Sequence, residues 1–259
     1  MSSIPISSPR AVIFDAYGTL FDVHSVVAAA EQLFPGQGDA LSQLWRQKQI
    51  EYTQLRTLSD PAGARYEPFW AITLDALRFA ATRLKLEQAL TPAAEKRLMD
   101  EYACLAAFPD TVAALKRLRK RADLKLAILS NGNPQMLDIA VKSAGMTGLF
   151  DHVLSVDTVR AYKPAHAAYA LGTQATGAAA HEIVFVSSNG WDVTGATWFG
   201  YTTFWLNRMA MPAEQLGALP RGTGRDMTDL LAFIDEGCPQ HQHIAPFDLS
   251  NRMRRNPGS

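Results

Sequence analysis

The stretch AVIFDAYGTLFDV, residues 11–23, runs from four apolar residues directly into Asp15 and then turns through Tyr17 and Gly18. A short run of wholly apolar residues is typical of a strand that is buried on both faces of a parallel sheet. Ligands in such sheets bind beyond the carboxyl ends of the strands. A carboxylate that directly follows a buried strand is therefore a candidate for chemistry, and the tyrosine two residues later bears on which chemistry that is.

The residues that follow this strand show a helical rhythm. Apolar residues recur at helical spacing in LSQLWRQKQIEYTQLRTL (41–58) and FWAITLDALRFAATRLKL (69–86), and no strand-like run interrupts residues 23–106. A further helix is predicted to begin with Thr91 as its N-cap and Pro92 at its first position. We therefore predict that this part of the chain is entirely helical.

From residue 108 onward, short apolar strands alternate with helices, which predicts a parallel sheet covered on both faces. The chain is therefore predicted to be an α/β protein with a Rossmann-like, doubly wound parallel sheet core formed by residues 1–22 and 107–237. Residues 23–106 are predicted to form an inserted all-helical cap domain. The polar, irregular C-terminal tail, residues 238–259, is predicted to be flexible.

Composition narrows the class of protein. The chain has 259 residues, 47% of them hydrophobic, and a formal net charge of zero. A balanced charge gives no support for binding to nucleic acid or to a membrane surface, and no segment approaches the ~20 apolar residues of a membrane span. The N-terminal MSSIPISSPR lacks the features of a secretory signal, and Cys104 and Cys238 have neither metal-type nor disulfide-framework spacing. We therefore expect a cytoplasmic protein that acts on a small molecule.

Side chains that can carry chemistry follow four of the predicted strands. They are Asp15 after AVIF; Ser130 and Asn131 after LAIL; Asp157 and Lys163 after HVLSV; and Ser187, Asn189 and Asp192 after IVFV. Because the carboxyl ends of parallel strands meet at one edge of a sheet, we expect these side chains to lie close together. A constellation delivered by four separate segments is more specific than any single short motif.

The motifs FDAYGTL, LSNGN, YKP and VSSNGWD occur in this order, with a helical insert after the first. Together they resemble the haloacid dehalogenase superfamily and, within it, the L-2-haloacid dehalogenases. The resemblance covers roughly residues 10–236 and includes LWRQKQIEYTQLR, a helical stretch particular to the dehalogenase branch. It implies a sheet core with a helical cap and a hydrolase that cleaves carbon–halogen bonds.

The resemblance also bears on metal use. Most members of this superfamily are magnesium-dependent phosphatases whose first motif reads Asp-x-Asp and whose last motif supplies further acids. Here Tyr17 stands in place of the second acid, and Ser187 and Ser188 replace the Gly-Asp pair, which leaves Asp192. Because Mg²⁺ requires several hard oxygen ligands, the loss of two carboxylates predicts that the enzyme uses no metal and no other cofactor.

By this resemblance, Asp15 attacks C2 of a short L-2-haloalkanoate, expels halide with inversion and forms an aspartyl ester that water hydrolyses to a D-2-hydroxyalkanoate. An aspartate is ordinarily ionised at neutral pH, so it can attack without a general base. The implied catalytic set is Asp15, Thr19, Arg46, Ser130, Lys163, Tyr169, Ser187, Asn189 and Asp192. In it, Arg46 receives the halide, Lys163 restrains the nucleophile, and Asp192 positions or deprotonates the water.

The resemblance implies a substrate pocket as well. Its predicted lining is Tyr17, Arg46, Gln47, Ile50, Phe69, Ser130, Asn131, Lys163 and Trp191. Periodicity alone favours ordinary core positions for Ile50 and Phe69 and a surface position for Arg46, and plain packing stays open for Tyr169. Residues 60–63 (DPAG) look like a short loop insertion just before Phe69, and their role is left open.

Two other functions remain as alternatives. A magnesium-dependent small-molecule phosphatase of the same superfamily would hydrolyse phosphate monoesters and lose activity with a chelator. A non-catalytic binding protein would have kept the fold without needing an intact set of Asp15, Ser130, Lys163 and Asp192. The resemblance further implies a homodimer that pairs through the helical cap, with no nucleic-acid or membrane partner.

Overall fold

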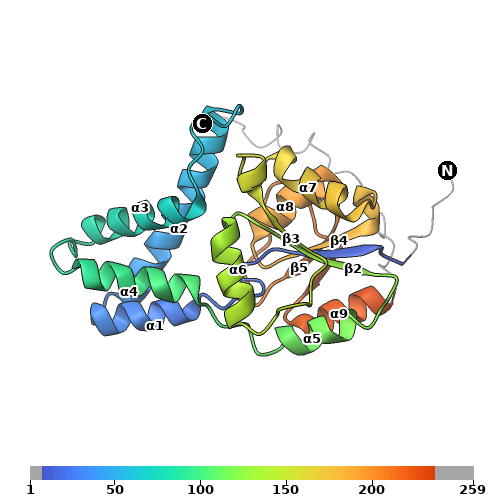
Figure 1. Ribbon diagram of the computed structural model, residues 1–259, viewed down its shortest axis with the longest axis horizontal. Helices are drawn as coiled ribbons and strands as arrows, with labels where there is room; N and C mark the ends of the chain where they lie inside the picture. Colours follow the sequence, from blue (N-terminus) through green and yellow to red (C-terminus); the bar gives the residue numbers. More distant parts are fainter. Residues whose placement is uncertain (1–7, 237–259) are drawn as a thin grey trace, which may run out of the picture.

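A single parallel sheet organises the molecule (Figure 1). The computed structural model describes residues 8–236, so the predicted flexible tail lies outside the described residues. The sheet has six strands in the order β3-β2-β1-β4-β5-β6, and every neighbouring pair is parallel. The strands are β1 (Ala11–Phe14), β2 (Lys125–Ser130), β3 (His152–Ser155), β4 (Ile183–Ser187), β5 (Thr202–Leu206) and β6 (Gly222–Gly224).

The order of the strands places a switch point beside β1. The chain moves outward from β1 through β2 to β3 and then returns to add β4, β5 and β6 on the other side of β1. All four residues of β1 are fully buried, because the strand pairs with β2 on one edge and with β4 on the other. A crevice at the ends of β1 and β4 is where a doubly wound sheet binds its ligand.

Helices cover both faces of the sheet, as the alternating rhythm predicted (Figure 1). On one face α5 (Thr111–Leu118) packs against α9 (Met227–Asp235), and on the other α7 (His166–Thr176) packs against α8 (Gly190–Phe199). Helix α6 (Pro134–Ser143) lies beside the edge strand β3. The Rossmann-like, doubly wound fold class is therefore confirmed.

The residues between β1 and α5 form a separate group of helices, which lies to one side of the sheet (Figure 1). These cap helices are α1 (His24–Leu33), α2 (Gly38–Ser59), α3 (Phe69–Arg83) and α4 (Pro92–Ala103). The Oγ1 of Thr91 accepts a hydrogen bond from the backbone N–H of Ala94, and Pro92 occupies the first turn, so the predicted helix start is confirmed. The exact domain boundaries stay a prediction.

The short strand β6 was not predicted. Its sequence, GTG, has no apolar side chain, so it lacks the signal that marks a buried strand. It forms because the edge of β5 leaves backbone groups to be paired, and Gly222 and Gly224 let the backbone pass close to the rings of Phe204 and Phe233.

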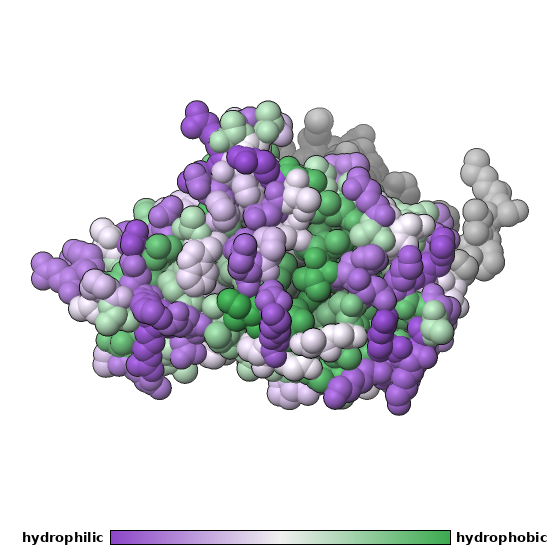
Figure 2. Space-filling model, in the orientation of Figure 1, coloured by the Kyte–Doolittle hydropathy of each residue, from purple (hydrophilic) through white to green (hydrophobic). Residues whose placement is uncertain are grey.

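The surface is mixed in character (Figure 2). Hydrophilic residues dominate the face shown, and a hydrophobic area lies toward its middle. Within residues 8–236, no helix combines the length and the apolar character that crossing a bilayer requires.

Candidate functional site

The turn after β1 places Asp15 at the switch point. The backbone N–H of Asp15 continues the pairing with β4 by donating to the carbonyl oxygen of Val186 at 2.9 Å. The chain then reverses at Gly18, whose φ of +83° is a conformation that side chains rarely adopt. A Cβ at this glycine would also lie 3.3 Å from the Nη2 atom of Arg46. The glycine therefore allows both the tight turn and the close approach of a cap arginine.

Four hydrogen-bond donors hold the Asp15 carboxylate in one orientation. Its Oδ1 accepts from Nζ of Lys163 at 2.8 Å. Its Oδ2 accepts from Oγ1 of Thr19 at 2.9 Å, from Nδ2 of Asn189 at 2.8 Å and from Oγ of Ser187 at 3.4 Å. The structure thus brings together five predicted site residues, which come from the turn after β1, the segment before α7 and the end of β4.

Lys163 joins two carboxylates. Its Nζ lies 2.8 Å from Oδ1 of Asp15 and 2.7 Å from Oδ2 of Asp192, and its third donor reaches the carbonyl oxygen of Leu129 at 3.2 Å. The side chain is only 1% exposed. Burial alone would lower the pKa of this lysine, but the two carboxylates outweigh that effect and hold its pKa above the ordinary value. The ammonium is therefore a permanent positive centre of the site.

Asp192 is a buried acid in the first turn of α8. Burial raises its pKa above the ordinary value, because the ammonium of Lys163 and the hydroxyl of Tyr169 offset the loss of hydration only in part. The Tyr169 hydroxyl donates to Oδ1 of Asp192 at 2.8 Å. A carboxylate with a raised pKa is a stronger base than an ordinary aspartate, which suits it to accepting a proton. Tyr169 is thus more than plain packing, since it contacts this acid directly.

Arg46 brings a second cation to the site from the cap. It lies on α2, and its Nη2 donates to Oδ1 of Asn189 at 2.8 Å and to the carbonyl oxygen of Tyr17 at 3.3 Å. The arginine is therefore a bridge between the cap helices and the ends of β1 and β4, not a surface residue of an amphipathic helix.

A small cavity of about 40 Å³ lies where these elements meet. It is lined by Asp15, Tyr17, Arg46, Ile50, Thr53, Phe69, Ser130, Asn131, Lys163, Asn189 and Trp191. Pockets for drug-sized ligands measure roughly 300–1,000 Å³, so this cavity suits a ligand of only a few non-hydrogen atoms. Two of its lining side chains have a buried donor without a partner among the described residues, namely the hydroxyl of Tyr17 and Nε1 of Trp191. Such donors are available to an anionic ligand.

One predicted lining residue does not reach the cavity. Gln47 is exposed, whereas Arg46, Ile50 and Thr53 line the cavity from one face of α2. These three follow the i, i+4, i+7 spacing of a single helix face, and a residue directly after Arg46 points away from that face. The structure therefore does not bring Gln47 to this cavity, and the missed Thr53 could have been found from the helical period.

A layer of aromatic and polar side chains behind the cavity was also missed. Tyr102 of α4 stacks on Tyr17 with ring centroids 5.4 Å apart, and its hydroxyl lies 3.5 Å from Oε1 of Gln49. Gln49 in turn donates to Oγ1 of Thr73 at 2.9 Å. No sequence motif marks these residues, because they contact the lining of the cavity and not its interior.

The donor set of the site can be compared with that of a metal centre. Among residues 8–236, no group of three or more His, Cys, Asp or Glu side chains is arranged to hold a metal ion. The two acids at the site, Asp15 and Asp192, already share the Lys163 ammonium.

Comparison with known proteins places this geometry in a family. A family model described as haloacid dehalogenase-like hydrolase matches residues 9–200. A curated relative from Pseudomonas sp. (strain YL), named (S)-2-haloacid dehalogenase, is 48% identical over 87% of this chain and 93% of its own length.

Solved structures agree with the sequence relatives. A crystal structure of an L-2-haloacid dehalogenase matches with a TM-score of 0.86 and 62% identity, over 88% of this chain and all of that one. An L-2-haloacid dehalogenase from Xanthobacter autotrophicus with chloropropionic acid covalently bound matches with a TM-score of 0.78 and 37% identity, over 88% of this chain and 98% of that one. The sequence-based resemblance is therefore confirmed, and this chain belongs to the haloacid dehalogenase-like hydrolase family.

Proposed function

We propose that this protein is an (S)-2-haloacid dehalogenase, which hydrolyses short L-2-haloalkanoates to D-2-hydroxyalkanoates and halide without a metal. The observation that carries the proposal is the Asp15 carboxylate, which four donors fix beside a cavity of about 40 Å³ that also contains Arg46. Relatives at 40–48% identity that bear this name support the assignment.

In the first step, an oxygen of the Asp15 carboxylate attacks C2 of the substrate. A C–O bond forms while the carbon–halogen bond breaks, and the halogen leaves with the bonding electron pair as halide. Attack from the side opposite the leaving group inverts C2. The product of this step is an ester between Asp15 and the alkanoate.

The donors around the cavity can receive the two negative groups of the substrate. Asn131 uses its Oδ1 to accept from the backbone N–H of Lys163, which leaves its amide N–H groups for the ligand. These N–H groups of Asn131, the guanidinium of Arg46 and Nε1 of Trp191 together form the part of the cavity that receives the halide. The hydroxyls of Ser130 and Tyr17 can donate to the substrate carboxylate.

In the second step, water attacks the carbonyl carbon of the Asp15 ester. Asp192 accepts one proton from this water. The ester C–O bond then breaks, the departing alkoxide takes up the second proton of the water to become the hydroxyl of the D-2-hydroxyalkanoate, and the Asp15 carboxylate is restored. Lys163 keeps Asp192 in place, and Ser187 and Asn189 orient the water near the ester. The second step does not involve C2, so the inversion from the first step persists in the product.

The alternative of a magnesium-dependent phosphatase has less support. Phosphoryl transfer requires cations that neutralise the charge spread over the transferring group. At this site the side chain two residues after the nucleophile is the neutral phenol of Tyr17, whose pKa burial raises further above its ordinary value. The remaining acid, Asp192, is already paired with an ammonium.

We further propose that the protein is cytoplasmic and forms a homodimer through its cap. Leu55 and Leu58 on α2 and Phe79 on α3 are 54%, 78% and 39% exposed, and burial between two copies would remove them from water. Sedimentation equilibrium tests the dimer. A monomer at micromolar concentration would contradict it.

The decisive experiment for the function is halide release from each enantiomer of 2-chloropropionate, with and without a chelator, by the wild type and by Asp15→Ala. We expect release from the L enantiomer alone, no effect of the chelator, and no release by the variant. In heavy-oxygen water, a single turnover should give an unlabelled 2-hydroxypropionate, because its new oxygen comes from Asp15. Turnover of both enantiomers, loss of activity with chelator, or label in that first product would contradict the proposal.

A further inference from the structure

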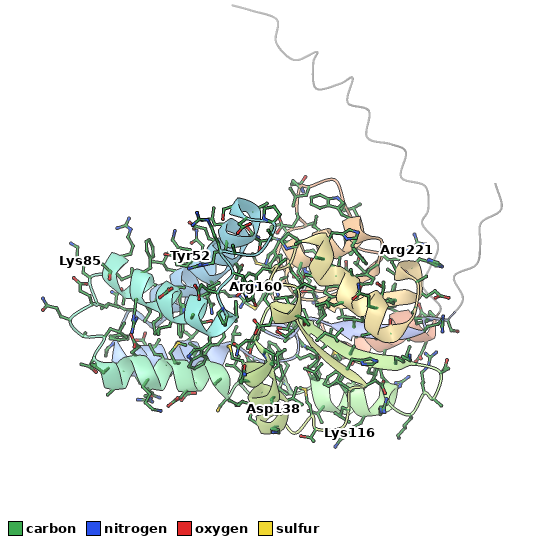
Figure 3. All side chains as sticks on the ribbon, turned by 45° about the horizontal axis from the view of Figure 1, so that its top comes forward. Tyr52, Lys85, Lys116, Asp138, Arg160 and Arg221 are labelled. Carbon is green, nitrogen blue, oxygen red and sulfur yellow. The ribbon has the colours of Figure 1, made fainter. Side chains whose placement is uncertain are left out.

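A cap loop and a core segment meet beside the cavity. The cap loop, defined here as residues 57–67, comprises the last three residues of α2 and most of the link to α3. The core segment, residues 157–163, ends at Lys163. Figure 3 shows Arg160 of this segment at the junction between the cap helices and the sheet core, whereas Tyr52 lies farther out on the cap.

Two tyrosines tie the loop and the segment together. The Tyr66 hydroxyl donates to Oδ1 of Asp157, and the Tyr162 hydroxyl donates to the carbonyl oxygen of Glu67. The two rings stack, with centroids 4.8 Å apart and an interplanar angle of 25°. Each side therefore contributes one ring and one acceptor to the contact.

A close backbone approach adds to this contact. The carbonyl oxygen of Gly63 accepts from Nε of Arg160 at 3.1 Å. Gly63 has a φ of +77°, and a Cβ there would lie 2.9 Å from the Cβ of Arg160 and 3.0 Å from its carbonyl oxygen. Only a glycine readily adopts this positive φ and also leaves room for Arg160. This residue of the inserted DPAG stretch therefore allows the loop to approach the core segment closely.

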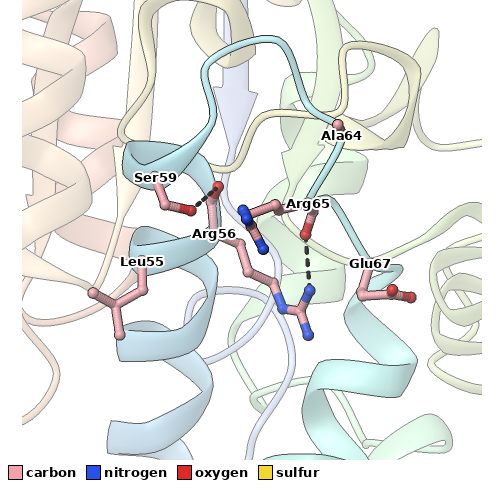
Figure 4. A pocket seen from close by; sticks show the side chains of 6 residues that line it. All are labelled: Leu55, Arg56, Ser59, Ala64, Arg65 and Glu67. Atoms are coloured by element: carbon pink, nitrogen blue, oxygen red, sulfur yellow. Dashed lines mark hydrogen bonds between the residues drawn. The ribbon is translucent and has the colours of Figure 1, made fainter.

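The loop has an internal structure of its own. The Asp60 carboxylate accepts from the backbone N–H groups of Ala62 at 3.1 Å and Arg65 at 3.2 Å. The Arg56 guanidinium donates to the carbonyl oxygen of Arg65 at 2.8 Å across a surface hollow at the end of α2 (Figure 4). The loop is therefore held by hydrogen bonds of its own in addition to its contacts with the core.

Backbone hydrogen bonds connect the contact between cap loop and core segment to Lys163 of the candidate site. The N–H of Tyr162 donates to Oγ1 of Thr57 at 3.0 Å, and the next N–H, that of Lys163, donates to Oδ1 of Asn131 at 3.0 Å. Consecutive N–H groups are therefore held by the cap and by the core. The Lys163 side chain goes on to hold both carboxylates.

We propose that the loop of residues 57–67 is a latch that closes the cap over the cavity and, through Tyr162, positions Lys163. The positioning part rests on the proposed function, because it concerns the lysine that restrains the nucleophile. When the latch is open, a 2-haloalkanoate enters between cap and core; when it is closed, the cavity is sealed and Lys163 is in place. Tyr66 and Gly63 are positioning residues in this scheme, since they touch neither substrate nor reacting atoms.

Two variants test the latch, each with a matched control on the cap. Tyr66→Phe removes one hydroxyl and keeps the ring, with Tyr52→Phe as its control. Gly63→Ala adds a Cβ against Arg160, and its control is Gly36→Ala, where φ is +78° and no atom lies within 4 Å of the added Cβ. The controls reproduce the chemical change and the backbone strain without touching the core.

Hydrogen exchange of the ligand-free, full-length protein gives a readout that does not require turnover. We expect amides of residues 57–67 and 157–163 to exchange about tenfold faster or more in both latch variants, because a hydrogen bond to a charged group is lost or the contact is pushed apart. In the controls these two segments should exchange as in the wild type. Unchanged exchange in the latch variants, or equal acceleration in the controls, would overturn the latch.

Kinetics test the coupling to Lys163. We expect kcat for L-2-chloropropionate to fall at least severalfold in the latch variants, while the controls keep the wild-type kcat. Faster exchange with an unchanged kcat would overturn the coupling between the latch and Lys163. The contact between residues 57–67 and 157–163 would then have no effect on catalysis. If the wild type released no halide although the exchange pattern appeared as expected, the proposed function would fail and the latch would stand.

Discussion

The two halves of the candidate site are built in different ways. The core half consists of side chains at or just after the ends of strands β1, β2 and β4, together with the segment before α7. Its two carboxylates are held by hydrogen bonds from other core side chains. The cap half consists of Arg46, Ile50, Thr53 and Phe69, which project from the faces of two helices. The core half therefore holds the reacting groups in fixed positions, whereas the cap half supplies the walls of the cavity and one cation, Arg46. Each of the following predictions tests that contrast.

The largest effect is expected in the core half, from Lys163→Met. The change leaves the carboxylates of Asp15 and Asp192 buried without their shared ammonium, which should cost about 3–5 kcal/mol of unfolding free energy at neutral pH. Urea unfolding measures this loss. The loss should shrink as the pH falls, because protonation removes the uncompensated charges, and a pH-independent loss would contradict the electrostatic cause.

Halide release by Lys163→Met should also fall by a factor of at least about 10³, because the nucleophile is no longer restrained. Near-normal turnover would show that the core half does not depend on its central cation.

On the cap, Arg46→Met is expected to have the next largest effect. It removes the positive charge beside the cavity and keeps the length of the side chain, so halide release should fall by roughly 10²–10³ with little loss of stability. The neighbouring Gln47→Ala serves as the control, and it should change kcat/KM by less than about twofold, since Gln47 is exposed. Similar effects of the two changes would contradict the assignment of one helix face to the cavity.

The pH dependence of ester hydrolysis tests the core half alone, because it depends on the protonation of Asp192. Catalysis by Asp192 needs its carboxylate form, and burial raises the pKa of this acid, so ester hydrolysis should be lost as the pH falls through a value above the usual 3.8. Below that value the rate should drop about tenfold per pH unit. Because the Tyr169 hydroxyl lowers this pKa, Tyr169→Phe should move the acid limb to higher pH. Rapid-quench measurement of the hydrolysis step checks this, and an unmoved limb would assign it to another group.

The smallest effect is expected from Trp191→Phe, which keeps an aromatic wall and removes one buried donor. If Nε1 of Trp191 receives an anionic group, kcat/KM should fall by roughly three- to tenfold, the range of one ordinary hydrogen bond. Trp198→Phe on the same helix is the matched control, since Trp198 is 62% exposed and lies outside the cavity lining. Equal effects would point to helix packing as the cause.

The same contrast explains how much the sequence could predict. Strands β1 to β5 and the cap helices follow from apolar runs and helical periods, because those patterns are set by burial. The side chains after the strands were predicted to meet. Asp15, Ser130, Asn131, Lys163 and Asn189 do line one cavity, because parallel strands deliver their ends to one edge, whereas Asp157 contacts Tyr66 of the cap loop instead. The roles of these residues stay a prediction.

What could not be predicted depends on contacts between distant segments. Gln47 was placed in the cavity by resemblance, although the helical period assigns that face to Arg46 and Thr53. The contacts of Tyr66 and Gly63 with the core join residues about 95 positions apart, and no local pattern encodes such a partner. Strand β6 forms from glycines that carry no burial signal.

The placement of Lys163 on the core side and Arg46 on the cap side has a consequence for the fate of the halide. Ester formation discharges the carboxylate beside the lysine and creates an anion beside the arginine, so one unit of negative charge crosses from the core wall to the cap wall. In the proposed latch mechanism, the halide then attracts the cap, which is the domain that moves away from the core to release it. Chloride or bromide in the medium should therefore slow turnover, because halide bound at Arg46 would hold the cap closed on the core. The arginine thus makes the released halide an inhibitor of its own departure.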